Sequence, residues 1–289
     1  MVFFVLPLMP GDPVDIMLGD TAAIADRSAL RRELGLDRPL HRRYLSFVLD
    51  LTKGDLGRSI HTRRPVRQMI AERYPATVSL AATALAVAIA LSVPAGLLAA
   101  ARPHGAVDRA TMAASLAGAA IPNFWLGPML IFLFAVRLNW LPVSGAGGPA
   151  HLILPAATLG LSMSGILTRM LRSSVIESLG EDYVRTARAK GVSEVMVHVK
   201  HAFSNALTPL LSVAGLQIGG LLAGAVITET VFAWPGIGRL TIQAIETRDY
   251  PVVQGCVLVI ALSYVLVNLA TDLAYAWIDP RMRIHDDGT

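Results

Sequence analysis

The sequence lacks the short motifs that mark the common hydrolytic enzymes. It contains no Gly-Lys-Ser or Gly-Lys-Thr, which a loop that cradles ATP phosphates requires, and no His-Glu-x-x-His or Gly-x-Ser-x-Gly. Its seven histidines show no metal-ligand spacing, and the nearest pair, His198 and His201, is expected on a solvated helical face. We therefore expect no catalytic residue, no metal site and no ATP hydrolysis by the usual route.

Cysteine and charge are also scarce. Cys256 is the only cysteine, which excludes an intramolecular disulfide. Charged residues make up 16% of the chain, compared with roughly 25% in an ordinary soluble domain, and 54% of residues are hydrophobic. Apolar runs close to the ~20 residues that cross a bilayer lack the alternation of barrel strands, so they predict helices and an all-α polytopic membrane protein. The five expected spans cover residues 76–101, 110–136, 151–169, 205–228 and 251–273.

The first 75 residues depart from this pattern. Residues 1–9 are apolar but too short to cross a bilayer, so we expect the remnant of a first transmembrane helix and a truncated or misassigned start. They lack the basic n-region of a signal peptide. Residues 10–75 are predicted to form an extracytoplasmic helical domain. Its helices are expected from Asp26 to Gly35, from Pro39 to Gly54, and onward from Pro65.

Basic residues are distributed unevenly between the predicted loops. If five spans alternate, the short loops on one side hold only Arg137, Arg239 and Arg248. The positive-inside rule places the other side, with the loop 171–204 and the tail 279–289, in the cytoplasm. The basic residues on that side are Arg102, Arg109, Arg169, Arg172, Arg185, Arg188, Lys190, Lys200, Arg281 and Arg283.

A short charged helix is predicted within the loop 171–204. Glu181 and Asp182 suit its positive end, and Lys190 suits its negative end. Gly191 can take the left-handed conformation that ends a helix, and Ser193 is expected to cap the next one. A charged helix between two apolar spans is expected to contact something outside the membrane.

The spans themselves are nearly free of ionisable residues. Ile121-Pro-Asn-Phe-Trp125 and Gly127-Pro128 interrupt the span 110–136 and predict a kink, which either lines a cavity or is merely tolerated. Glu229 is expected at a span end, facing the outer mouth. The residues considered for the path or gate are Asn123, Phe124, Trp125, Gln217, Glu229 and Trp234.

Small residues recur along the span 205–228. Gly215, Gly219, Gly220 and Gly224 form two overlapping small-xxx-small patterns, which allow another helix to approach closely. The partner helix belongs either to this chain, the commoner case, or to a second subunit.

Several motifs give the chain a family resemblance. Tyr183-Val-Arg-Thr-Ala-Arg-Ala-Lys-Gly191, followed by His201-Ala-Phe-Ser-Asn-Ala-Leu207, resembles the cytoplasmic loop of ABC-transporter permeases, and more narrowly the B-type permease of dipeptide and oligopeptide importers, which include nickel and glutathione systems. Arg185-Thr186-Ala187 stands where the general pattern has Glu-Ala-Ala, which resembles the peptide branch. Further matching segments are Gly35-Leu-Asp-Arg-Pro39, Gly54-Asp-Leu-Gly57, Pro75-Ala-Thr77, Pro122-Asn-Phe-Trp-Leu-Gly127, Trp140-Leu-Pro-Val-Ser-Gly145, Leu154-Pro-Ala-Ala-Thr-Leu-Gly160, Glu229-Thr-Val-Phe-Ala-Trp-Pro-Gly-Ile-Gly238, Arg248-Asp-Tyr-Pro-Val-Val-Gln-Gly255 and Asp279-Pro-Arg281.

The resemblance implies a type I ABC importer permease fold, with residues 76–278 as the transmembrane domain, in the cytoplasmic membrane of a prokaryote. Implied partners are a second homologous permease, two cytoplasmic ATPases that use ATP and Mg²⁺, and an extracytoplasmic solute-binding protein. This chain itself would bind no cofactor. The implied ATPase-coupling residues are Asp182, Tyr183, Arg185, Thr186, Ala187, Arg188, Ala189, Lys190 and Gly191.

Small peptides are the expected cargo, with nickel chelates and glutathione left open. Two other functions are weighed against this one. An ion-gradient-driven secondary transporter of a small solute would need ionisable residues within its spans, which this sequence largely lacks. A membrane scaffold without transport activity is the other alternative.

Overall fold

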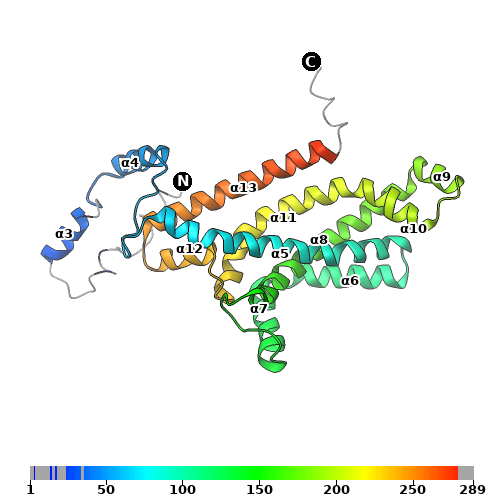
Figure 1. The fold of residues 1–289 in the computed structure, drawn as a ribbon, viewed down its shortest axis with the longest axis horizontal. Coiled ribbons are helices and arrows are strands. Elements are labelled where there is room, and N and C mark those ends of the chain that lie inside the picture. Colours follow the sequence, from blue (N-terminus) through cyan, green and yellow to red (C-terminus); the bar gives the residue numbers. More distant parts are fainter. Residues whose placement is uncertain (1–2, 4–13, 15–16, 18–23, 34–35, 279–289) are drawn as a thin grey trace, which may run out of the picture. The chain divides into compact units, whose positions relative to one another are not determined.

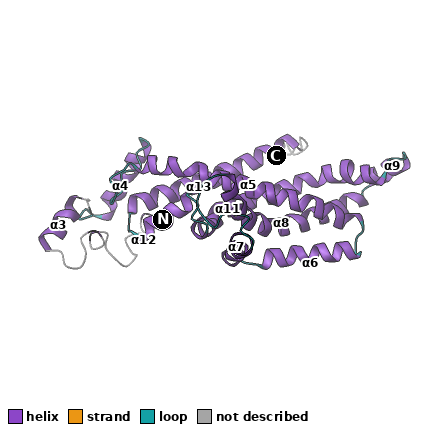
Figure 2. Cartoon of the chain, turned by 60° about the horizontal axis from the view of Figure 1, so that its bottom comes forward, coloured by secondary structure: helices purple, strands orange, loops and turns teal. Residues whose placement is uncertain are grey.

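The protein is built from helices (Figure 1). The computed structural model describes residues 3, 14, 17, 24–33 and 36–278, and these residues contain helices and loops but no β-strand (Figure 2). The expected all-α membrane fold is confirmed. In chain order the helices are α3 (Ile24–Glu33), α4 (Leu40–Thr52), α5 (Val66–Ala101), α6 (Ala106–Ala120), α7 (Asn123–Leu130), α8 (Pro149–Gly180), α9 (Asp182–Ala189), α10 (Glu194–Met196), α11 (Phe203–Val231), α12 (Ile237–Glu246) and α13 (Tyr250–Ile278), with π-helical turns at Ile131–Arg137 and Val197–Ala202.

One compact unit comprises residues 1–77 and 235–262. It contains α3, α4, α12 and the first parts of α5 and α13. The hydroxyl oxygen of Thr77 accepts a hydrogen bond from the backbone N–H of Ile237 (2.8 Å), which satisfies a free donor at the start of α12. The core of this unit is formed by Val66, Ile70, Ile237, Leu240, Ala244, Tyr250, Val252, Val253 and Cys256.

The second compact unit comprises residues 78–234 and 263–289. Within it, α8 packs against α6 on one side and α11 on the other, and the three run side by side in both views (Figures 1 and 2). Leu159, Leu167 and Leu171 of α8 are fully buried, as expected for a central helix. The short helix α9 follows α8 directly.

The helix pair α6 and α7 is sharply bent. The segments Ala106–Ala120 and Asn123–Arg137 meet at 101°. Ile121 has an extended backbone (φ −76°, ψ 120°), as expected for a residue that precedes a proline, and Pro122 occupies the N-cap of α7. The kink predicted within residues 110–136 is therefore confirmed, and Pro122 is its cause.

Several expected boundaries lie elsewhere in the structure. The helix expected from Pro65 begins at Val66 but continues without interruption to Ala101, so the proposed domain boundary after residue 75 falls inside α5. Asp26 lies within α3 rather than capping it. Residues 1–9, apart from Phe3, and the tail 279–289 lie outside the described residues.

Three described helices are long and apolar enough to cross a membrane: Val66–Ala101, Pro149–Gly180 and Tyr250–Ala274. Two bent pairs, Ala106–Ala120 with Asn123–Arg137 and Glu194–Leu221 with Ala225–Val231, raise the number to five if each pair is one span. The count of five spans stays a prediction.

Candidate functional site

The local sequence defines both ends of α9. Glu181 adopts an extended backbone (φ −73°, ψ 152°) that separates α9 from α8, and Asp182 occupies the first turn. Arg188 lies in the last turn, so charges of the favourable sign stand at both ends of the helix dipole. Ser193 occupies the expected N-cap position of α10 with an extended backbone, although its side chain makes no capping hydrogen bond.

Gly191 ends α9 in the left-handed conformation that the sequence predicted (φ +77°). The N–H of Gly191 donates to the carbonyl of Arg188 (2.9 Å), and the N–H of Val192 donates to the carbonyl of Ala187 (3.2 Å). These two bonds form a Schellman motif, which satisfies the last carbonyls of the helix. A side chain at Gly191 would strain this turn whatever space surrounds it.

The inner face of α9 is apolar. Val184 and Ala187 are buried and pack with Val197, which follows α10 in the chain, while Leu179 and Val192 cover the edges of the cluster. Ala187 is one of the residues expected to couple to an ATPase, but only 7% of its surface is exposed. Its small side chain instead lets α9 lie close to the segment that leads into α11.

The outer face of α9 is polar and exposed. Asp182, Arg185, Thr186 and Ala189 lie three and four positions apart, on the side opposite Val184, and all are exposed. Arg185 forms a 3.2 Å ion pair with Asp182. Lys190 and Gly191 are exposed at the end of the helix, so most residues expected to couple to an ATPase are accessible.

Two side chains tie α9 to the segments that follow it. The hydroxyl of Tyr183 accepts a hydrogen bond from the amide of Asn205 on α11 (2.7 Å). Tyr183, one of the residues expected to couple to an ATPase, is 39% exposed in this chain. Arg188 donates two hydrogen bonds to the carboxylate of Glu194 (2.8 and 3.1 Å), and this contact raises the pKa of Arg188.

An exposed apolar patch beside α9 was not predicted. Val195, Met196 and Val199 are 75%, 48% and 53% exposed. The neighbouring Val197 is fully buried, so the segment turns one apolar residue inward and three outward. Their apolar character in a segment expected to be cytoplasmic was the available signal.

A buried ion pair fixes the beginning of α6 to α8. Arg172 binds both carboxylate oxygens of Asp108, with a distance of 2.7 Å from its Nη2 to Oδ2. The same Oδ2 accepts the backbone N–H of His104 (2.8 Å). Asp108 is 3% exposed, so it acts as a packed cross-link at the turn between α5 and α6.

The residues considered for a path or gate differ in exposure. Phe124 and Trp125 are 60% and 51% exposed on α7, directly after the bend. Asn123 and Gln217 are partly exposed. Glu229 was expected to face an outer mouth, but its side chain is fully buried, and its carbonyl accepts the N–H of the buried Trp234 (2.8 Å).

The glycines of α11 that were expected to pack against another helix differ in how close their neighbours lie. A Cβ added at Gly215 would lie 2.4 Å from Thr271, and one at Gly219 would lie 2.3 Å from Tyr264, so both glycines allow close approach by α13 of the same chain. Gly220 has no such neighbour within 4 Å. The surroundings of Gly224 lie outside the described part.

The described residues include no group of three or more His, Cys, Asp or Glu side chains that could hold a metal ion. The arrangement around α9 offers instead an exposed polar stripe, an apolar patch and a rigid attachment to α11. It suits recognition of another protein, rather than chemistry on a small molecule.

Comparison with known proteins gives two kinds of match. Residues 92–284 match the family of binding-protein-dependent transport system inner membrane components, and residues 1–81 match the N-terminal family of such membrane components. The dipeptide transport system permease protein DppB of Escherichia coli K12 is 42% identical over 98% of this chain and 93% of DppB. The glutathione transport system permease protein GsiC of Escherichia coli O6:H1 is 41% identical over 98% of this chain and 92% of GsiC.

Solved structures share the fold at lower identity. The inward-facing MetNI methionine ABC transporter aligns with a TM-score of 0.62 at 18% identity, covering 73% of this chain and 97% of the compared chain. An amino acid ABC transporter aligns with a TM-score of 0.54 at 14% identity, covering 74% of this chain and 94% of the compared chain.

Proposed function

The chain belongs to the family of binding-protein-dependent transport system inner membrane components, and we propose that it forms half of a path that carries small peptides. It is a multi-pass permease subunit of an ABC importer in the inner membrane and not itself an enzyme. The assignment of a peptide cargo rests on two relatives. DppB and GsiC, which are named for dipeptide transport and for transport of the tripeptide glutathione, each match 98% of this chain.

The outer face of α9 is the proposed docking surface for a cytoplasmic ATPase. Its support is local: Arg185, Thr186 and Ala189 are exposed together, and Val195 and Met196 add apolar area beside them. Exposed apolar patches with polar rims are typical of protein interfaces. Because the sequence lacks a P-loop, ATP and Mg²⁺ are assigned to two partner ATPases and no cofactor is assigned to this chain.

The exposed aromatic residues of α7 are the proposed contribution to the path. Phe124 and Trp125 follow the 101° bend and face away from the packed core of their unit. Such exposed residues in a membrane bundle suit either the path itself or the surface that meets a second, homologous permease. Glu229 and Trp234 are assigned to packing, because both are buried within this chain. A solute-binding protein on the extracytoplasmic side would deliver the cargo.

The cargo is tested by uptake in a strain that lacks this chain but retains its partner subunits. Labelled dialanine, glutathione and nickel are offered separately, with and without the chain. We expect the chain to restore dialanine uptake and an excess of other unlabelled dipeptides to compete with it. Restoration of nickel uptake alone would contradict a peptide cargo while leaving the permease family unaffected.

A further inference from the structure

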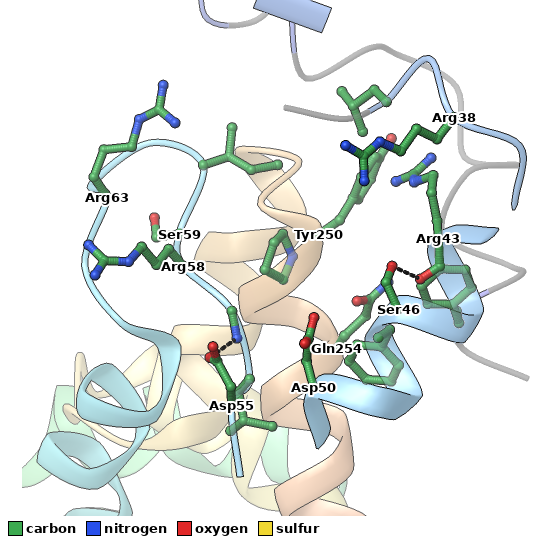
Figure 3. Close-up of a pocket in the computed structure, with 17 residues that line it drawn as sticks. Arg38, Arg43, Ser46, Asp50, Asp55, Arg58, Ser59, Arg63, Tyr250 and Gln254 are labelled. Atoms are coloured by element: carbon green, nitrogen blue, oxygen red, sulfur yellow. Dashed lines mark hydrogen bonds between the residues drawn. The ribbon is translucent and has the colours of Figure 1, made fainter. Parts of the chain in front are cut away.

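A cavity of about 380 Å³ opens between α4, the loop of residues 57–65 and the beginning of α13 (Figure 3). Its lining contains four arginines and two aspartates: Arg38, Arg43, Arg58, Arg63, Asp50 and Asp55. Asp55 already accepts the backbone N–H of Gly57 (2.8 Å). The excess of positive charge favours an anionic occupant.

Arg38 and Arg43 are the centre of this positive charge. Figure 3 shows both side chains gathered on the same side of the pocket as Tyr250. Within the described ranges, neither arginine forms an ion pair with a carboxylate. Arg43 is partly buried, and this burial lowers the pKa of Arg43. Arg38 is exposed at the rim of the pocket. Two neighbouring guanidinium groups that pair with no carboxylate of the described residues are suited to bind an oxyanion.

The wall of the pocket is fixed in place by Asp249. The hydroxyl of Ser59 donates to Asp249 Oδ2 (2.5 Å), and the backbone N–H of Ile60 donates to Oδ1 (3.1 Å). Asp249 is only 4% exposed and directly precedes α13. The loop of residues 57–65 is thereby held against the start of α13, so an occupant would meet a preformed site.

The position of the pocket along α13 indicates its depth in a membrane. Tyr250, Pro251 and Gln254 line the pocket and form the first turns of the apolar helix Tyr250–Ala274. A pocket where a span begins lies at the level of the lipid headgroups, because the apolar part of the span occupies the hydrocarbon layer.

Helix α4 has the amphipathic character of a helix that lies in this interface. Arg43, Ser46 and Asp50 face the pocket. The other side of α4 is apolar yet exposed, with fractions of 40%, 63%, 36% and 54% for Tyr44, Leu45, Val48 and Leu49. A helix with one charged face and one exposed apolar face is suited to the boundary between headgroups and acyl chains.

We propose that this pocket binds the phosphate of a phospholipid headgroup through Arg38 and Arg43, with the exposed apolar face of α4 buried among the acyl chains of the same leaflet. Inorganic phosphate shares the anionic chemistry but has no acyl chain for α4. The lipid is therefore the occupant that uses both the charge and the apolar face. The proposal goes beyond peptide transport and does not depend on the identity of the cargo.

The first test measures lipid binding by the full-length chain. The chain is stripped of lipid in detergent and titrated with phosphatidylglycerol, and bound lipid is counted by native mass spectrometry. We expect the double variant Arg38→Gln, Arg43→Gln to weaken binding about tenfold or more, since it removes both guanidinium groups that would hydrogen-bond the phosphate inside the pocket. The matched control is Arg42→Gln, an exposed arginine of the same helix outside the pocket, which should bind as the native chain does.

Inorganic phosphate at millimolar concentration is expected not to displace the lipid. Displacement, or equal lipid binding by the double variant and the control, would overturn the proposal. Unchanged thermal unfolding of the variants separates lost binding from lost folding. None of these measurements involves transport, so a failed uptake experiment leaves them unaffected.

The second test locates α4 in nanodiscs that contain the full-length chain. A fluorophore is attached at Leu45→Cys, with Lys53→Cys, just beyond the helix, as the control site; the native Cys256 is buried. Lipids brominated on their acyl chains should quench the probe at residue 45 more strongly than the probe at residue 53. Equal quenching at the two sites would show that this face does not lie among the acyl chains. Loss of the difference once partner subunits are bound would show that another protein covers this face. Either result would contradict the proposal.

Discussion

Buried and exposed residues adjoin one another along α9. A substitution in this helix therefore tests either packing within the chain or contact with a partner, depending on its position. Ala187 is buried against Val184 and Val197, whereas Thr186 is exposed. A larger residue at position 187 would act first on packing within the chain, because overpacking a close-fitting cluster costs about 1–3 kcal/mol. Only an outward residue tests contact with a partner without that internal effect.

We expect the double variant Thr186→Trp, Val195→Asp to reduce the amount of ATPase that co-purifies with the chain. A bulky ring and a buried charge in the docking surface should weaken association about tenfold or more, as substitutions at central interface positions do. The measurement is the ratio of ATPase to tagged permease after purification from membranes. Lys53→Glu, an exposed change outside the second unit, is the control. Equal ratios for the variant and control would contradict docking at this surface.

Sequence and structure agree at Gly191 for a local reason and differ at Ala187 for a non-local one. The left-handed conformation of Gly191 depends on the backbone of one turn, which the residue type itself indicates. The inward direction of Ala187 depends on Val197, ten residues later, and on the angle at which the intervening segment returns. The types of the residues in α9 do not predict the angle at which that segment returns. Asp108 was missed for the same reason, because its partner Arg172 lies 64 positions away.

At the scale of helices, one proline ends a helix while another lies inside one. Pro122 separates α6 from α7, and a 101° bend results. Pro75 lies within the continuous helix α5, so this proline does not end the helix. A transmembrane helix can tolerate proline when the freed backbone carbonyl finds another partner. Apolar runs in the sequence predicted which segments are helices. The lengths and bends of these helices depend on tertiary packing, which the apolar runs do not predict.

Helix packing between α11 and α13 provides a matched pair of substitutions. A Cβ at Gly219 would lie 2.3 Å from Tyr264, whereas one at Gly220 would meet nothing within 4 Å. We expect Gly219→Ala to lower the free energy of unfolding by about 1–3 kcal/mol through overpacking. Gly220→Ala should be neutral or stabilising by up to about 1 kcal/mol, because alanine favours the helix. Thermal unfolding of the purified chain in nanodiscs measures both, and similar loss of stability in the two variants would contradict the packing of α11 against α13.

At the scale of the whole molecule, two of the three carboxylates that are buried among the described residues make structural contacts. Asp108 is held by Arg172 and the backbone of His104. Asp249 accepts hydrogen bonds from Ser59 and Ile60. A carrier driven by protons or sodium needs ionisable groups that can change their state within the membrane, and these are expensive to keep there. The structural contacts of Asp108 and Asp249 leave fewer groups free to couple to an ion gradient and so favour an external energy source.

An external energy source predicts that uptake by the complete importer depends on ATP and not on an ion gradient. In proteoliposomes that contain this chain, its partner permease and the ATPases, with binding protein outside, labelled dipeptide uptake should require ATP inside. An uncoupler that collapses the ion gradient should leave the initial rate unchanged within about twofold, because no step of the proposed mechanism consumes the gradient. Vesicles loaded with a non-hydrolysable ATP analogue are the control and should show no sustained uptake. Uptake that persists without ATP and stops with the uncoupler would instead identify a secondary transporter.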